Sequence, residues 1–217
     1  FTTVNGSNFS RIVRLEATGA IDPGFNPGTG ANGDVHAVAV GGDGSILAGG
    51  DFTIFNGVPA GRIVRLLPNG SVDPNFNSGS NFNDSVRAIV VQPSDSKVLV
   101  AGYFTAANGL VRPRVARLNV DGSVDSSFNP GSGANEYVAA LALQTDGKIL
   151  VAAGFTVFNR AERNHIARPE RPCERPSQRF GLFRRARDLP DHPRGSSRTT
   201  GRIISSIDTP PCWKLSR

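Results

Sequence analysis

The sequence has few of the residues that form cross-links and membrane anchors. Among its 217 residues are no methionine, one tryptophan and two cysteines. Both cysteines, Cys173 and Cys212, lie near the C-terminus, so no disulfide framework supports the first 160 residues. No apolar run approaches the roughly 18–20 residues that a transmembrane helix requires. We therefore expect no membrane insertion.

Positive charge is also scarce over most of the chain, although the net charge is +6. Residues 1–160 contain 11 lysines and arginines against 12 acidic residues, a net charge of −1. Residues 161–217 contain 13 against 6, a net charge of +7. A basic protein that binds nucleic acid would carry its charge on the folded domain. We therefore expect no nucleic-acid partner for the first 160 residues.

What the sequence does contain is a repeat. The stretch from Arg65 to Asn77 recurs from Arg14 and from Arg117, so the copies start 51 and 52 residues apart. A fixed period of this length indicates a repeat architecture. Three other motifs keep the same period, and the chain holds about three copies and the beginning of a fourth. The recurring motifs begin at Phe52-Thr53-x-x-Asn56-Gly57, Phe25-Asn26-Pro27-Gly28 and Gly44-Ser45-Ile46-Leu47.

The first half of each copy predicts a β-hairpin. In the second copy the strands flank Pro68-Asn69-Gly70, a three-residue turn whose glycine suits the left-handed position. Counting outward from this turn places Leu66 opposite Val72 and Arg65 opposite Asp73. Two opposite charges that face each other across a strand pair stabilise the pairing by about 0.2–1 kcal/mol and fix its register. We interpret this pair, and the equivalent pairs Arg14–Asp22 and Arg117–Asp125, as hairpin construction and not as a ligand site.

The second half of each copy predicts another hairpin, with strands at 86–91 and 98–102. Its first strand in the third copy, residues 138–143, is apolar on both faces, which is typical of a strand between two layers. Small residues such as Ala48 and Gly49 would let neighbouring sheets approach. Four short strands in about 51 residues favour a propeller blade over a coil of a β-solenoid. The predicted fold class is therefore all-β, with tandem four-stranded blades.

These motifs resemble the delta-60 repeat, a bacterial β-propeller repeat. The resemblance covers residues 1–168 and implies a large, secreted or cell-surface protein without a general catalytic activity or cofactor. A propeller ring needs about 4–8 blades. We therefore expect the chain to be a fragment, with partner blades outside it. We expect an extracellular or cell-surface location, although no signal peptide is visible.

The repeat stops after Arg168, where Leu-Asn is expected and Pro169-Glu170-Arg171 stands instead. We expect residues 169–217 to form a disordered tail, because such a segment buries too little apolar surface to offset its ordering entropy. Four origins remain open. They are a basic nucleic-acid tail, an Arg/Pro-rich linker, a diverged fourth blade and a shifted reading frame that makes the tail non-native. One extra C before a Leu-Asn codon pair would give Pro-Glu-Arg.

Candidate catalytic, cofactor and metal residues do not emerge from this pattern, and we expect none. The histidines His36, His165 and His192 share no spacing, and the cysteines form no Cys-x-x-Cys motif. Gly28-x-Gly30-x-x-Gly33 matches a dinucleotide fingerprint but precedes a predicted strand instead of a helix. The carboxylates Asp34 and Asp84 are too isolated for a calcium loop.

Positions that differ between copies are the better candidates for recognition. They lie at 58–61 against 110–113 and at 81–85 against 134–137, where Phe82 and Tyr137 would suit stacking on a sugar or packing on a protein. Ordinary loop variation is the alternative. The expected function is a non-catalytic module that binds a protein or glycan. The other possibility is a propeller enzyme acting on polysaccharide, whose site would appear as a histidine or carboxylate in one blade only. None is evident in the sequence.

Overall fold

The computed structural model describes residues 1–167 except 5, 10 and 77–81, and these residues form seventeen β-strands and no helix. The predicted all-β fold class is therefore confirmed. The expected disordered tail, residues 169–217, lies outside the described residues. Within the described part, no helix is long and apolar enough to cross a membrane.

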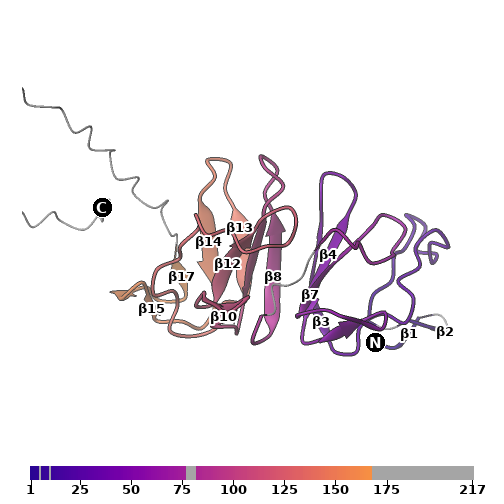
Figure 1. Ribbon diagram of the computed structural model, residues 1–217, viewed down its shortest axis with the longest axis horizontal. Helices are drawn as coiled ribbons and strands as arrows, with labels where there is room; N and C mark the ends of the chain where they lie inside the picture. The colour runs from indigo at the N-terminus through magenta and orange to yellow at the C-terminus, as the bar shows by residue number, and fades with distance from the viewer. Residues whose placement is uncertain (5, 10, 77–81, 168–217) are drawn as a thin grey trace, which may run out of the picture. The chain divides into compact units, whose positions relative to one another are not determined.

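Three repeats fold into three antiparallel sheets of one design, which we call blades 1, 2 and 3. In each blade the second strand lies between the first and the third. The first strands β3, β8 and β13 follow one another, and β8 contacts both of the others (Figure 1). Blade 1 contains β3 (Val35–Val40), β4 (Ile46–Gly50) and β7 (Ile63–Leu66), blade 2 contains β8 (Val86–Val91), β9 (Val98–Gly102) and β12 (Val115–Leu118), and blade 3 contains β13 (Ala140–Leu143), β14 (Ile149–Ala152) and β17 (Ile166–Ala167).

In blades 1 and 2 the fourth strand is reduced to a single bridge. Leu66 pairs with Val72 in the predicted register, and Leu15–Ile21 and Leu118–Val124 repeat this bridge. The charge pair is formed as well, because Arg65 Nε donates to Asp73 Oδ2 at 2.8 Å. The equivalent distances are 2.7 Å for Arg14–Asp22 and 2.8 Å for Arg117–Asp125. The hairpin interpretation of these pairs is confirmed.

A small hairpin that the sequence reading missed lies between the second and third strands. Asn56 and Gly57 both have positive φ, 48° and 75°, as a type I′ turn requires. Asn32 holds this hairpin from the preceding loop, because its Oδ1 accepts the backbone N–H groups of Thr53 and Ile54. The hairpins are β1 (Thr3–Val4) with β2 (Ser7–Asn8), β5 (Ile54–Phe55) with β6 (Val58–Pro59), β10 (Ala106–Ala107) with β11 (Leu110–Val111), and β15 (Val157–Phe158) with β16 (Ala161–Glu162).

Apolar clusters join neighbouring blades. One cluster contains Leu47 and Ile63 of blade 1 together with Val86 and Ile89 of blade 2. A methyl group at Gly49 would lie 2.4 Å from Val86 Cγ1, so the predicted close approach of the sheets depends on this glycine. The core therefore lies between the sheets.

The prediction that residues 138–143 form a strand covered on both faces is wrong. The strand β13 begins at Ala140, and its side chains alternate between exposed and half-buried. Leu141 and Leu143 pack against blade 2, whereas Ala140 and Ala142 are exposed because no described residue covers them. The equivalent strand β8, which lies between two blades, is largely buried.

Candidate functional site

A row of polar and aromatic side chains lies where the first strand of each blade begins and the second strand ends. In blade 1, His36 follows the first residue of β3 and Asp51 follows β4. His36 Nε2 lies 2.8 Å from Asp51 Oδ2. Blade 1 therefore carries a histidine and a carboxylate together at a strand end, an arrangement that was not evident in the sequence. Sequence spacing did not show the pair, because strand pairing joins residues fifteen positions apart.

The environment of Asp51 favours its charged form. Partial burial works against ionisation, but the Ser85 hydroxyl and the His36 ring outweigh it and hold the pKa of Asp51 below its ordinary value. Arg87 of blade 2 contributes a favourable charge as well. Because Ser85 and Arg87 belong to the next repeat, the row continues from blade 1 into blade 2.

In blade 2 the same positions carry an arginine and a tyrosine. Arg87 Cζ lies 5.1 Å from the centroid of the Tyr103 ring, within the range of a cation–π contact. Tyr137, from the loop before β13, stacks on Tyr103 with centroids 4.6 Å apart and an angle of 10°. The three side chains form a continuous stack that crosses from blade 2 to blade 3.

Blade 3 carries the smallest residues at these positions. Ala139 stands where His36 and Arg87 stand, and Gly154 stands where Asp51 and Tyr103 stand. Both residues are exposed. A methyl group at Gly154 would lie 3.5 Å from Tyr137 Cε1, so the Tyr137 ring borders bare backbone here. We call the set the strand-end row, and it consists of His36, Asp51, Ser85, Arg87, Tyr103, Tyr137, Ala139 and Gly154.

Bulges and unusual backbone angles hold the row. The pairing of β3 with β4 shifts between Val35 and Ala37, so His36 is an extra residue, and Arg87 occupies the same place in β8. The third strands are preceded by residues with positive φ, 68° at Arg62 and 67° at Arg114. Their side chains donate to the backbone oxygens of Asp51 and Tyr103. No turn motif in the sequence indicated this role.

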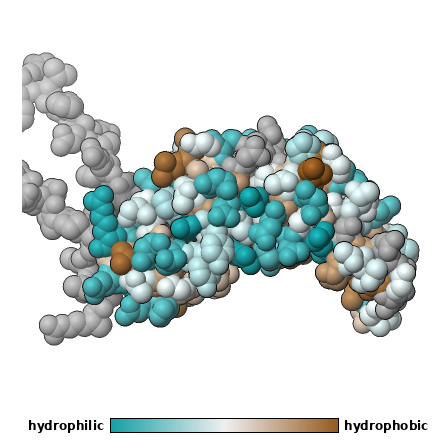
Figure 2. Space-filling view, turned by 90° about the horizontal axis from the view of Figure 1, so that it is seen from below, coloured by the Kyte–Doolittle hydropathy of each residue, from teal (hydrophilic) through white to brown (hydrophobic). Residues whose placement is uncertain are grey.

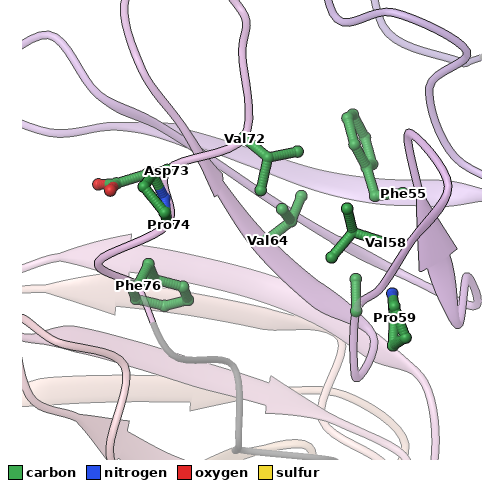
Figure 3. A pocket seen from close by; sticks show the side chains of 9 residues that line it. Phe55, Val58, Pro59, Val64, Val72, Asp73, Pro74 and Phe76 are labelled. Carbon is green, nitrogen blue, oxygen red and sulfur yellow. The ribbon is translucent and has the colours of Figure 1, made fainter.

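A separate apolar pocket of about 300 Å³ lies in blade 1. Its lining includes Val58, Pro59 and Ala60 of the variable stretch 58–61, and the residue equivalent to Ala60 in the next repeat is Arg112. Figure 3 shows the carboxylate of Asp73 pointing away from the apolar side chains. This carboxylate is already bound by Arg65. The pocket therefore offers mainly apolar contact, and it is lined by Phe55, Val58, Pro59, Ala60, Val64, Val72, Asp73, Pro74 and Phe76.

The two aromatic candidates for recognition, Phe82 and Tyr137, lie in different environments. Phe82 was expected on the surface, but it is 3% exposed and its ring lies 4.5 Å from that of Phe104. The prediction of Phe82 as a recognition residue is wrong, because its bridge to Ala107 turns the ring into the core. Tyr137 is half-buried and belongs to the strand-end row.

The other candidates have local roles. Asp34 pairs with Arg11 at 3.2 Å, and Asp84 accepts a hydrogen bond from the Ser85 backbone. Residues 28–33 precede a strand, β3, so the geometry of a dinucleotide fingerprint is not formed. Among residues 1–167, apart from those left undescribed, no three potential metal ligands come together. His165 contacts the Ala153 carbonyl, whereas Cys173, His192 and Cys212 lie outside the described residues.

The fold and its repeat define a β-propeller class, with blades built from antiparallel three-stranded sheets and a bridged edge. A family model described as a domain of unknown function (DUF5122) beta-propeller matches residues 1–25, 41–76, 94–128 and 144–168. These segments cover more than half of the chain, and the protein belongs to this family.

Comparison with known proteins adds little beyond the fold. No curated protein matches the chain. One similar solved structure is a catalytically inactive virginiamycin B lyase from Staphylococcus aureus with quinupristin, at 17% identity and a TM-score of 0.37. The match covers 67% of this chain and 44% of that one, so the chain spans less than half of that protein.

Proposed function

We propose that the protein is a non-catalytic propeller module that binds a protein or glycan ligand, in a secreted or surface-attached bacterial protein of the delta-60 repeat type. The observation that supports the proposal is the strand-end row. Blades 1 and 2 have the same bulge at this place, and the equivalent positions of the three blades carry different pairs of side chains, His36 with Asp51, Arg87 with Tyr103, and Ala139 with Gly154. A constant scaffold with varied side chains at one end suits recognition.

The chemistry of the row suits a ligand with hydroxyl groups and an apolar face. Asp51 accepts hydrogen bonds, and Arg87 donates them. Tyr137 lies beside the exposed Gly154, which has no side chain to cover the ring. A sugar ring would meet both needs, and aromatic side chains favour such amphipathic contacts. The near-neutral repeats argue against a nucleic-acid ligand.

Binding of the full chain to a glycan array, followed by titration of the best glycan, tests this proposal. Tyr137→Ala should weaken binding about tenfold or more, the range of a stacked ring in a binding site. Val111→Ala removes apolar surface from β11, which contributes no residue to the row, and serves as the control because Val111 is 73% exposed. Equal affinities of the two variants would contradict the role of the row. Failure of every glycan and of protein capture would contradict the binding function.

The pair His36–Asp51 favours a second candidate, a propeller enzyme acting on polysaccharide. It is a histidine and a carboxylate 2.8 Å apart in one blade only, an arrangement that can transfer a proton. In that case the chain should release reducing ends from a polysaccharide panel, and both His36→Gln and Asp51→Asn should abolish the release. Binding without turnover by the wild-type chain would decide for the binding module.

A further inference from the structure

The two tyrosines of the chain lie in one contact. Tyrosine occurs twice among the 217 residues, whereas phenylalanine occurs thirteen times. Both tyrosines belong to the strand-end row, because Tyr103 follows β9 in blade 2 and Tyr137 lies in the loop before β13 of blade 3. Their rings stack with centroids 4.6 Å apart and an angle of 10° between the ring planes. The fold therefore brings both phenol groups of the chain together across a blade junction.

The packing of the blades does not require phenol rings at this junction. Tyr103 and Tyr137 occupy the positions that carry Asp51 and Ser85 between blades 1 and 2. A phenylalanine ring would provide the same stacking surface. Within the described part of the chain, no hydrogen bond joins either phenol hydroxyl to another residue. The hydroxyl groups thus supply a chemistry that the fold itself does not use.

We infer that Tyr103 and Tyr137 form a site of oxidative cross-linking, at which a one-electron oxidant joins the two rings as dityrosine. The new bond links blade 2 covalently to blade 3. Both side chains are half-buried, so a small oxidant and water reach the edges of the rings. This inference concerns a modification and not a ligand, so it does not depend on the proposed binding function.

The cross-linking reaction consumes two equivalents of the oxidant. Each phenol gives one electron to the oxidant and one proton to water, which leaves two phenoxyl radicals. A carbon–carbon bond then forms between a Cε carbon of one ring and a Cε carbon of the other. The hydrogens on these two carbons leave as protons, and each phenol oxygen takes up one proton again. The product therefore has two hydrogen atoms fewer than the starting chain, and no other group is lost.

The stacked rings have the arrangement that this coupling requires. A phenoxyl radical bonds through the face of its Cε carbon, because the unpaired electron occupies the π system. Two nearly parallel rings with centroids 4.6 Å apart present these faces to each other. Reactants held in contact react without a diffusional encounter, which raises the rate of the step. Gly154 lies beside Tyr137 Cε1 and has no side chain to keep the ring from tilting into the new bond.

Oxidation of the full chain by a photogenerated ruthenium(III) complex tests the inference. The native chain should give a cross-linked monomer in which the tryptic peptides 98–114 and 118–148, each with one tyrosine, are joined. The cysteines are reduced and blocked before digestion, because a disulfide also removes two hydrogen atoms. In concentrated urea the rings are apart, so the yield of cross-linked monomer should fall about tenfold or more. Equal yields with and without urea, or no joined peptides from the native chain, overturn the inference.

Coupling between two chains is the competing reaction, and it depends on encounters of separate molecules. Figure 2 shows a hydrophilic middle on the visible side of the molecule, and a low protein concentration reduces such encounters further. The matched control is the double variant Tyr103→Phe/Val58→Tyr. It keeps two tyrosines and a ring at position 103, but it moves one phenol to β6 of blade 1, where Val58 is 50% exposed. This variant should give no cross-linked monomer, and a yield equal to that of the wild type contradicts the inference.

The covalent link between the blades should also change the stability. It closes the chain between residues 103 and 137 and so restricts the unfolded state, as a disulfide does. The midpoint of thermal unfolding of the cross-linked wild-type chain should therefore rise by about 5 °C or more. Tyr137→Phe, treated with the same light and oxidant, controls for other oxidation, and its midpoint should not rise. Equal midpoints of the wild-type chain before and after cross-linking overturn the link between the blades.

Discussion

Two groups of side chains recur along the chain, and they differ in how far their copies agree. At the outer edge, an arginine binds an aspartate at 2.7–2.8 Å and covers a phenylalanine ring at 4.9–5.0 Å, and this edge cluster is the same in all three copies. At the strand-end row, no two copies agree. The edge cluster comprises Arg14, Asp22 and Phe25, Arg65, Asp73 and Phe76, and Arg117, Asp125 and Phe128.

The edge cluster and the strand-end row differ in which groups their side chains bind. Arg65 also donates to the backbone oxygen of Val120 at 2.6 Å, and Arg14 donates to that of Pro68 at 2.6 Å, so each arginine ties its hairpin to the turn of the next repeat. Such a group cannot change alone, because its partners would lose their hydrogen bonds. The side chains of the row are held mainly by one another. They can therefore differ between blades.

The largest effect should come from removing the best-connected member of an edge cluster. The Asp125 side chain is 6% exposed and accepts hydrogen bonds from Lys97 and Arg117, each at 2.8 Å. Asp125→Ala leaves both cations without this partner and should cost about 2–3 kcal/mol of unfolding free energy in urea titrations. Asp22→Ala at the more exposed first hairpin should cost clearly less. Equal losses would show that burial does not set the strength of the cluster.

A smaller effect is expected at the contact between sheets. A methyl group at Gly49 would lie 2.4 Å from Val86, so Gly49→Ala should cost about 1–3 kcal/mol by overpacking. Gly42→Ala is the matched control, because a methyl group there meets nothing within 4 Å. The midpoints of thermal unfolding compare the two. No difference between them would mean that blades 1 and 2 are not closely packed.

Acid should remove only part of the stabilisation that Asp125 gives to its edge cluster. Burial opposes ionisation of Asp125, but hydrogen bonds from Lys97, Ser127 and Arg117 prevail and hold its pKa well below the ordinary value. A carboxyl group with a lowered pKa stabilises the fold above its unfolded pKa of about 3.9, and this contribution is lost as the pH falls toward the folded pKa. Unfolding free energy should therefore fall from pH 5 to pH 3.

The control for this pH effect is Asp125→Asn. Because the folded pKa of Asp125 lies below 3.8, this carboxylate still stabilises the wild-type protein in part at pH 3. The free energy that the wild-type protein loses through acid at Asp125 should therefore be smaller than the loss caused by Asp125→Ala. The Asn variant cannot titrate at this position, so its free energy should fall less between pH 5 and pH 3. An identical fall in both proteins would assign the acid sensitivity to other carboxylates.

The smallest effects should come from the row. Arg87→Ala should change the unfolding free energy by at most about 1 kcal/mol, because its stacking on Tyr103 is a partly exposed contact. Tyr137→Ala should cost about 0.5–1.5 kcal/mol through the lost ring pair. Urea titration measures both. A loss at either residue as large as that of Asp125→Ala would make the row part of the framework and would remove the basis of the comparison.

The sequence predicted the framework well, because each framework contact is local and repeated. The Arg65–Asp73 register followed from counting across one turn, and the close sheet contact followed from the small residue at Gly49. The row could not be predicted in this way. His36 and Asp51 meet through strand pairing across a bulge, and Tyr103 and Tyr137 meet through the packing of two blades. Neither contact repeats between copies, so no period revealed it.

The burial of a side chain also could not be predicted from the sequence where it depends on contacts with a neighbouring loop or blade. Phe82 occupies a variable loop, which suggested exposure, yet a bridge to Ala107 turns its ring into the core. Residues 140 and 142 of β13 were expected between two layers, but only one layer is present beside them in the described part. Apolar composition alone does not distinguish these cases.

The bulges at His36 and Arg87 have a consequence for engineering. A bulge residue has no partner in the ladder, so exchanging it leaves the strand register and the flanking hydrogen bonds in place. Residues 36 and 87 can therefore be substituted to change the binding properties of the surface while the fold is kept. A library that randomises residues 36 and 87 together with 51 and 103 would diversify one contiguous surface on an unaltered scaffold.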